Sequence, residues 1–346
     1  MSLVKRIVSL IVVAFWLTSM VPGADERQAT VIVNALDDHG IPIRSLSVSD
    51  FKFISRKHEI QPVDLRFSEG PRRVVVLIDV SGSMSDQVGD RRWEVARDAG
   101  IELVSAVPSG TQLSLLTFAK NVEAEAGMPS DRQQVLASLS NLKPSVEYKN
   151  GKGRTALYDA VLVALKSLDP PQVGDAIVVI TDGGENASKT RYSEIARALR
   201  AEPDVRLFAC LLVNWPTELD EAGRNALVQM VNDSGGGMMD ISAPSGYPEN
   251  MAYGRRPTLV FDDRMKSLIK NSANALSSEI SGFYLLTLKV PEHRSESNGW
   301  KVELADERGK RRDDVILVYP GHTDAIWKLP NHGMPTMPDA PQKGPN

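Results

Sequence analysis

Short apolar runs alternate with segments of helical periodicity through the middle of this chain. The runs at residues 74–78, 177–180 and 205–213 contain few or no polar residues, which is typical of strands buried on both faces. Between them, apolar residues recur every three to four positions, as on one face of an amphipathic helix. This alternation predicts an α/β fold with a doubly wound, mostly parallel sheet and helices on both faces.

Six helices and two further strands complete the prediction for this central region. Trp93, Gly100 and Val107 share one face of the first helix, and the third helix has the strongest helical pattern. We assign residues 72–281 to one α/β domain. The predicted helices cover residues 93–107, 135–142, 155–168, 193–199, 219–231 and 265–280, and the added strands cover residues 113–118 and 238–241.

The chain on either side of this domain has the period-two alternation of half-buried strands. This pattern defines an N-terminal segment, residues 28–70, and a C-terminal segment, residues 283–320. Each has about 40 residues, too few for a stable core of its own. Because the ends of a domain often lie close together, we expect the two segments to form one small β module. The expected strands cover residues 30–36, 51–54, 60–67, 284–288, 302–304 and 315–319.

The two ends of the chain differ in composition from a folded domain. Lys5 and Arg6 precede an apolar run at residues 7–17 and then a stretch of small and polar residues, the pattern of a secretory signal peptide. We predict a signal peptide over residues 1–24, with an uncleaved N-terminal anchor as the alternative. Residues 321–346 are rich in proline, which predicts a disordered tail. We therefore expect a secreted, periplasmic or cell-envelope protein.

Composition limits the classes of partner. Of the 346 residues, 42% are hydrophobic and 24% are charged, and the formal net charge is −4. This is a globular composition without the basic surface of a nucleic-acid-binding protein, so we expect no nucleic-acid partner. Contact with a membrane is expected only through an uncleaved N-terminal anchor. The single cysteine, Cys210, cannot form an internal disulfide and is interpreted as a buried core residue.

The most specific polar pattern follows the first buried run. Asp79, Ser81 and Ser83 are two residues apart, Thr155 begins the strongest predicted helix, and Asp182 follows another buried strand. Loops beyond the carboxyl ends of parallel strands share one edge of the sheet, where ligands bind. We therefore predict that these five oxygen-bearing side chains meet at one place.

Five oxygen donors suit a hard divalent cation. Mg²⁺ prefers about six oxygens and keeps some waters, and a hydroxyl-rich set also accepts Mn²⁺ or Ca²⁺. Because three of the donors are neutral hydroxyls, the ion would keep most of its charge and attract an anionic oxygen into an open position. The expected partner is a protein that offers an exposed Asp or Glu.

This set resembles the metal-ion-dependent adhesion site of von Willebrand factor A domains. The resemblance covers roughly residues 72–281 and implies a doubly wound sheet that binds a protein ligand through the metal. The flanks resemble the secreted bacterial VWFA-related proteins, whose N-terminal β segment is similar to residues 31–51 and whose C-terminal strand is similar to residues 283–286. All five positions of the metal motif match: Asp79, Ser81, Ser83, Thr155 and Asp182.

The sequence leaves two other functions open. A metal-dependent hydrolase using the same residues is the main alternative, but Ser81 stands where an Asp-x-Asp phosphotransferase has its second carboxylate. A structural subunit of an envelope assembly is the third interpretation. We expect a non-enzymatic binding protein, since Ser81 has no histidine partner for a nucleophilic role. The five histidines are isolated from the motif in sequence: His39, His58, His293, His322 and His332.

Other polar residues follow the same strands. Glu185 is interpreted as a solvated acid near a helix start, the glycosylation sequon at Asn186 as chance, and Lys152 and Arg154 as part of a solvated loop. The loop at residues 243–257 is expected at the metal edge and has residue types common at binding hot spots. We hypothesise a specificity rim, with a mobile insertion as the alternative, formed by Trp215, Tyr247, Tyr253, Arg255 and Arg256.

Overall fold

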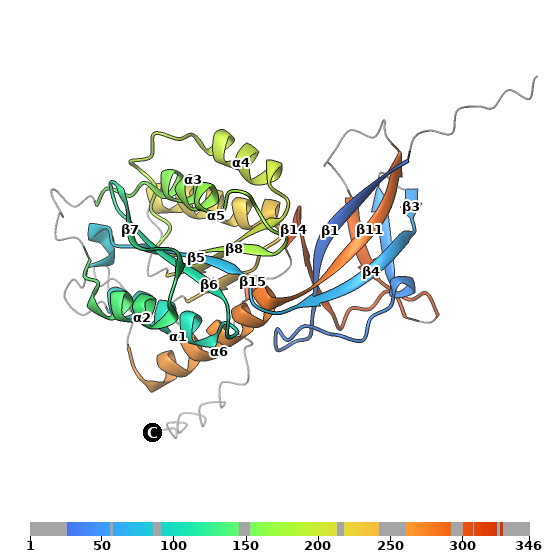
Figure 1. Cartoon of the computed structure of the whole chain (residues 1–346), viewed down its shortest axis with the longest axis horizontal. Helices are drawn as coiled ribbons and strands as arrows, with labels where there is room; N and C mark the ends of the chain where they lie inside the picture. The colour runs from blue at the N-terminus through green and yellow to red at the C-terminus, as the bar shows by residue number, and fades with distance from the viewer. Residues whose placement is uncertain are drawn as a thin grey trace, which may run out of the picture.

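The chain folds into two parts, an α/β part built on one large sheet and a smaller part made mainly of strands (Figure 1). Helix α6 (Asp263–Ser281) ends where the parts meet, and strand β11 (Gly282–Pro291) follows without a loop. The predicted signal peptide lies outside the described residues. The computed structural model describes residues 26–55, 58–85, 91–144, 153–212, 218–241, 261–291, 300–306, 308–323 and 326–327.

A seven-stranded sheet forms the centre of the α/β part. Its strands pair in parallel except for the last in spatial order, which is antiparallel to its neighbour. The predicted mostly parallel sheet is therefore confirmed. In spatial order the strands are β15 (Ile326–Trp327), β10 (Met238–Asp240), β9 (Val205–Leu211), β8 (Asp175–Thr181), β5 (Arg73–Asp79), β6 (Gln112–Phe118) and β7 (Val122–Ser130).

Helices cover both faces of this sheet (Figure 1). Successive side chains of β5 point to opposite faces, so that Val76 and Ile78 join one core cluster and Val75 and Leu77 join another. The first cluster contains side chains of α1 (Arg92–Ala106), α2 (Arg132–Asn141) and α6, and the second contains side chains of α3 (Leu157–Ser167), α4 (Tyr192–Ala201) and α5 (Glu218–Ser234).

No helix in the described parts of the chain is long and apolar enough to cross a membrane.

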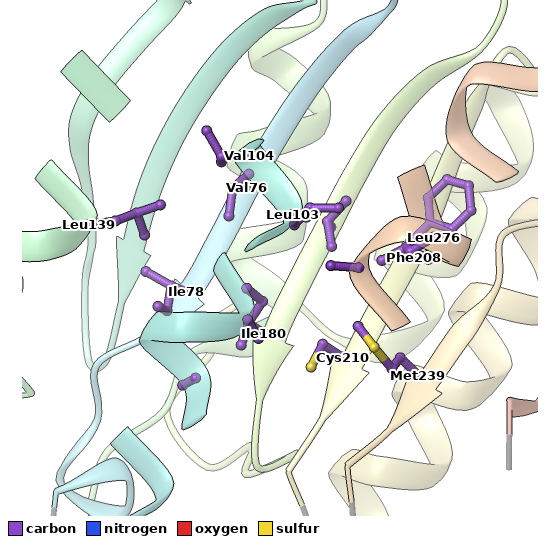
Figure 2. Close-up of a cluster of buried hydrophobic side chains, with 14 of the residues drawn as sticks. Val76, Ile78, Leu103, Val104, Leu139, Ile180, Phe208, Cys210, Met239 and Leu276 are labelled. Atoms are coloured by element: carbon purple, nitrogen blue, oxygen red, sulfur yellow. The ribbon is translucent and has the colours of Figure 1, made fainter. Parts of the chain in front are cut away.

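Cys210 belongs to the first of these clusters, as Figure 2 shows. Its side chain lies on β9 near Ile180 of β8 and Met239 of β10, and the residue is 1% exposed. Burial raises the pKa of the thiol, which keeps it protonated and unreactive. The interpretation of Cys210 as a core residue is confirmed.

Strand β7 was not expected from the sequence. It pairs with β6 at the edge of the sheet, and most of its residues are exposed or half-buried. Its inward positions include Ala126, which is 3% exposed. Alanine contributes little apolar area, so the period-two signal of this strand is weak.

The smaller part confirms the expected β module. N-terminal and C-terminal strands pair with one another, with β11 lying between β1 (Glu26–Leu36) and β4 (Pro62–Glu69). A second sheet places β12 (Trp300–Leu304) beside β2 (Phe51–Ser55), which also pairs with β3 (His58–Ile60). Side chains of both sheets share one core, including Phe51, Tyr284, Leu286, Val302 and Leu304.

The region predicted as a disordered tail contains two short strands. β14 (His322–Thr323) pairs with β13 (Ile316–Tyr319) in the β module, and β15 pairs with β10 at the edge of the central sheet. The prediction of a tail from residue 321 is therefore wrong for these strands, because pairs of two residues leave no periodic signal. Residues 328–346 lie outside the described residues.

The two parts meet around a buried arginine, Arg206 of β9. Its Nη1 donates to Asn34 Oδ1 of β1 at 2.9 Å, and its Nη2 donates to the Ile280 carbonyl of α6 at 2.7 Å. The Asn34 Nδ2 donates to the carbonyls of Glu279 and Gly282, both at 2.9 Å. The carbonyls that an α-helix leaves without intrahelical partners at its end are thus bound by side chains from both parts.

Candidate metal site

The predicted metal residues lie where the central strands end. Asp79 is the last residue of β5, Asp182 directly follows β8, and Thr155 precedes α3. β5 and β8 are adjacent and parallel, so their carboxyl ends share one edge of the sheet. The Ala156 amide donates to the Ala119 carbonyl beyond β6 at 2.7 Å, which brings Thr155 to the same edge.

The loop after β5 turns back on itself around Asp79. The Ser81 amide donates to Asp79 Oδ1 at 2.8 Å, and the Ser81 and Ser83 hydroxyl oxygens are 3.0 Å apart. A short 3-10 turn, Gly82–Met84, holds these side chains together. Gly153 passes so close that a Cβ there would lie 3.1 Å from the Gly82 and Ser83 amide nitrogens, so the loop before Thr155 packs directly on this turn.

Thr155 and Asp182 approach one another at Gly184. A Cβ on Gly184 would lie 3.3 Å from Asp182 Oδ1 and 3.4 Å from Thr155 Oγ1. The Gly184 amide also donates to Asp182 Oδ1 at 3.1 Å. The structure therefore brings the hydroxyl and the carboxylate to one point, beside the turn that contains Ser81 and Ser83.

Asp79 is a fully buried carboxyl group. Its Oδ2 accepts a hydrogen bond of 2.6 Å from the Thr181 hydroxyl, which in turn accepts from the Gly183 amide at 3.0 Å. Burial, and after it the negative charge of Asp182, raise the pKa of Asp79 to about 7. Two nearby carboxylates in a site shielded from water repel one another, and a bound cation would relieve this repulsion.

Arg92, at the start of α1, also reaches the site. Its Nη1 lies 2.7 Å from Asp182 Oδ2 and 3.2 Å from the Ser83 carbonyl oxygen. The Asp182 side chain is 6% exposed and that of Arg92 is 17% exposed. Sequence reasoning missed this residue, because an arginine near a helix start has no spacing that identifies its partner.

The donors at this edge fit a hard divalent cation. The set consists of three hydroxyls and two carboxylates, the oxygen chemistry that Mg²⁺ and related ions prefer. Among the described residues, no group of three or more His, Cys, Asp or Glu could hold a metal, so a metal at this edge would depend on hydroxyl oxygens. The residues that would hold the ion are Asp79, Ser81, Ser83, Thr155 and Asp182.

The segment after Asp182 supports the loops around it. Glu185 Oε2 accepts from the Tyr158 amide at the start of α3 at 3.1 Å and from the Ser188 hydroxyl at 2.6 Å. Its interpretation as a solvated acid is therefore wrong: the side chain is half-buried and caps a helix. Asn186 Oδ1 accepts from the Thr155 amide at 3.0 Å, and Asn186 Nδ2 donates to the Gly153 carbonyl at 2.9 Å.

Of the basic residues expected near the site, Arg154 is exposed, in agreement with a solvated loop. Lys152 lies outside the described residues. The same holds for the whole hypothesised specificity rim, formed by Trp215, Tyr247, Tyr253, Arg255 and Arg256.

Several known proteins are similar to this chain. A UPF0353 protein of Nocardia farcinica (strain IFM 10152) is 29% identical over 132 residues, which are 38% of this chain and 36% of that protein. The chain thus covers about a third of the length of this relative. An aerotolerance-related membrane protein from Bacteroides fragilis NCTC 9343 has 20% identity and a TM-score of 0.42, over 60% of this chain and 98% of that chain.

A further solved structure is proximal thread matrix protein 1 from the mussel byssus, with a zinc-occupied MIDAS motif. It has 15% identity and a TM-score of 0.42, over 67% of this chain and 50% of that chain. Residues 74–185 match the family model of the von Willebrand factor type A domain. This segment contains β5 from its second residue onward, all of β8 and all five predicted metal residues. The chain therefore carries a von Willebrand factor type A domain.

Proposed function

We propose that this chain is a metal-dependent binding protein. Its five oxygen donors hold one divalent cation, for which we propose Mg²⁺, with Mn²⁺ or Ca²⁺ as alternatives. The ion in turn binds an exposed Asp or Glu of a partner protein. The observation that carries the proposal is the approach of Thr155 Oγ1 and Asp182 Oδ1 to one point at Gly184, next to the turn of Ser81 and Ser83.

The hydroxyl-rich donor set favours binding of an anion. When bound, the ion would supply a positive charge that hydroxyl oxygens do not neutralise. Asp79 is enclosed by hydrogen bonds from Thr181 and from the Ser81 amide, so it orients the turn rather than facing solvent. Asp182 is also shielded, with a side chain only 6% exposed. An incoming carboxylate would therefore meet few competing negative charges.

The contacts that Asp79 and Asp182 already make favour a binding function over metal-dependent hydrolysis. A general base must reach the proton that it abstracts. Both oxygens of Asp79 accept hydrogen bonds, and Asp182 is paired with Arg92. The histidines in the described parts of the chain are His39, His58 and His322, and all three belong to the β module. We therefore propose a non-enzymatic role.

We propose in addition that the protein is exported from the cytoplasm. The basic and apolar pattern of residues 1–24 supports a signal peptide, and a partner would then be met in the cell envelope or outside the cell. Expression with a C-terminal tag, followed by mass spectrometry of the mature N-terminus, tests this point. An intact residue 1 in the soluble cell fraction would contradict it.

Metal binding is tested by calorimetric titration of the purified protein with Mg²⁺, Mn²⁺ and Ca²⁺. We expect one saturable site in the wild type. Asp79→Asn keeps the shape of the side chain but removes its charge, and should weaken binding at least about 10-fold, as loss of a supporting carboxylate does in other metal sites. The matched control is Asp64→Asn, an exposed acid on β4, which should leave binding unchanged.

Partner binding is tested by capture from an envelope extract with and without a chelator. The proposal requires a protein that is retained by the wild type with metal, lost with chelator, and lost with Asp79→Asn. Replacing the acidic residue of that partner by its amide should also abolish retention. A partner held equally well in chelator would instead support the interpretation as a structural subunit, and turnover of a phosphoester or peptide lost in Asp182→Ala would support the hydrolase.

A further inference from the structure

Arg92 places a permanent positive charge inside the candidate metal site. Its Nη1 contacts Asp182 Oδ2 at 2.7 Å and the Ser83 carbonyl at 3.2 Å. These two acceptors come from different loops, one after β8 and one after β5. The guanidinium therefore bridges the two loops that would have to share a cation.

Stabilisation of helix α1 does not explain why a positively charged residue lies at its start. Arg92 is the first residue of α1, and a positive charge at a helix N-terminus is opposed by the helix dipole. The charge is therefore stabilised by the acidic site rather than by its own helix. Arginine stays protonated at any physiological pH, so this charge is always present.

We propose that Arg92 is an internal cation of the site, which competes with the metal for Asp182 and lowers the affinity of the site for the metal. The inference rests on the proposed function. Without Arg92, the carboxylates of Asp79 and Asp182 would both act on an incoming divalent ion. With Arg92, one of these two negative charges is already neutralised, so the attraction for the ion is weaker.

Because Asp182 has two carboxylate oxygens, it could contact Arg92 and a metal ion at the same time. The competition would then lower the affinity for the metal without preventing its binding. Oδ1 faces Gly184 and Thr155, whereas Oδ2 faces Arg92. A metal at the hydroxyl side would share the carboxylate with the guanidinium. The shared charge leaves the bound ion more electrophilic, which strengthens its attraction for a partner's carboxylate. Arg92 would thus reduce metal affinity and increase the affinity of the metal-bound site for an anion.

The test compares the metal affinity of the wild type, Arg92→Gln and Arg92→Lys by calorimetry at constant pH and salt. Removing the charge should tighten metal binding at least about 10-fold, because charges a few ångströms apart in a shielded site interact strongly. Arg92→Lys keeps the charge and should remain within about 3-fold of the wild type. The matched control is Arg97→Gln, a more exposed arginine of α1 beside Asp98, which should have no effect.

The direction of the affinity change in the two Arg92 variants distinguishes competition with the metal from mere orientation of Asp182. If Arg92 only orients Asp182, both Arg92 variants should bind metal more weakly than the wild type, and this result would overturn the inference. Thermal melts with and without metal check folding: Arg92→Gln should melt lower than the wild type without metal and gain more on metal addition. An unchanged affinity in Arg92→Gln, with binding intact in the wild type, overturns the inference alone. Absence of binding in the wild type and in every variant overturns the proposed function as well.

Discussion

At the residue scale, the buried carboxyl of Asp79 links protonation to stability. Its pKa is raised from 3.8 to about 7 in the folded protein by burial and by Asp182. Between these pH values the folded state holds a proton that the unfolded state releases, so the free energy of unfolding of the metal-free protein should fall as pH rises from about 4 to about 7. Urea denaturation in chelator at several pH values measures this slope.

The variant Asp79→Asn isolates this effect. An amide cannot lose a proton, so the slope between pH 4 and 7 should become flatter, and at pH 8 the metal-free variant should be about 2 kcal/mol more stable than the wild type, given about 1.4 kcal/mol per pKa unit and partial relaxation of the site. An unchanged slope in Asp79→Asn would show that another group titrates.

The stability gained from a bound metal ion should have the opposite pH dependence. Binding requires the charged form of Asp79, so the stability gained from Mg²⁺ should be largest above pH 7 and should decrease as pH falls through about 7. The rise in melting temperature on adding Mg²⁺, measured at pH 5.5 and pH 8, tests this expectation. An equal rise at both pH values would indicate that Asp79 does not titrate in this range.

Sequence reasoning identified the five candidate donors but not the residues that contact them, Arg92 and Asn186. The donors could be found because the ends of adjacent parallel strands must share an edge, whatever the loops do. Arg92 could not, because the place of a long side chain depends on how α1 packs. Asn186 has an ordinary sequence context, and its contact with Thr155 depends on how the loop after β8 folds back.

At the element scale, the loop after β8 positions the start of α3. Glu185 caps the helix, and Asn186 binds the backbone on both sides of Arg154. Thr155 lies in no regular element of its own, so its hydroxyl depends on these contacts for its place. Precise placement of ligands matters because metal geometry tolerates little error.

The variant Asn186→Ala tests this support. It removes the bonds to the Thr155 amide and the Gly153 carbonyl while leaving all five donors in place. We expect metal affinity to fall about 10-fold, with the free energy of unfolding reduced by only about 1 kcal/mol. The control is Asn141→Ala, an exposed asparagine at the end of α2, which should leave both quantities unchanged.

The helices and buried strands were predicted well because their apolar patterns are long. β7 was missed because its one buried residue is a small alanine, Ala126, and its other residues are exposed or half-buried. β14 and β15 were missed because each is two residues long. Pairing of such short strands depends on the sheet edge that they meet, which the local sequence does not encode.

At the scale of the whole molecule, Arg206 joins the two parts. It is fully buried and binds Asn34 of β1 and the carbonyls at the end of α6. Burial, and after it the charge of Arg72, lower the pKa of Arg206 to about 9, although the charge of Glu279 acts in the opposite direction. An apolar run interrupted by one arginine gives no sign of this contact, so the junction could not be predicted from the sequence.

Replacing this residue should weaken the whole protein. Arg206→Met keeps the length of the side chain but leaves the carbonyls and the Glu279 charge without the guanidinium, and should cost about 3 to 5 kcal/mol of unfolding free energy. Arg200→Met, at an exposed arginine of α4 paired with Asp233, should cost less than about 1 kcal/mol. Urea denaturation compares the two variants, and equal losses would contradict a special role for Arg206.

The order of strands in the β module has a consequence for synthesis of the chain. β1 and β4 both pair with β11, and β2 pairs with β12. Roughly two hundred residues separate β4 from β11, and the whole α/β part except its edge strand β15 lies between them. A growing polypeptide must therefore keep its first strands from aggregating until the α/β part has emerged. The α/β part is thus expected to fold first, and the β module closes only when the last segment arrives.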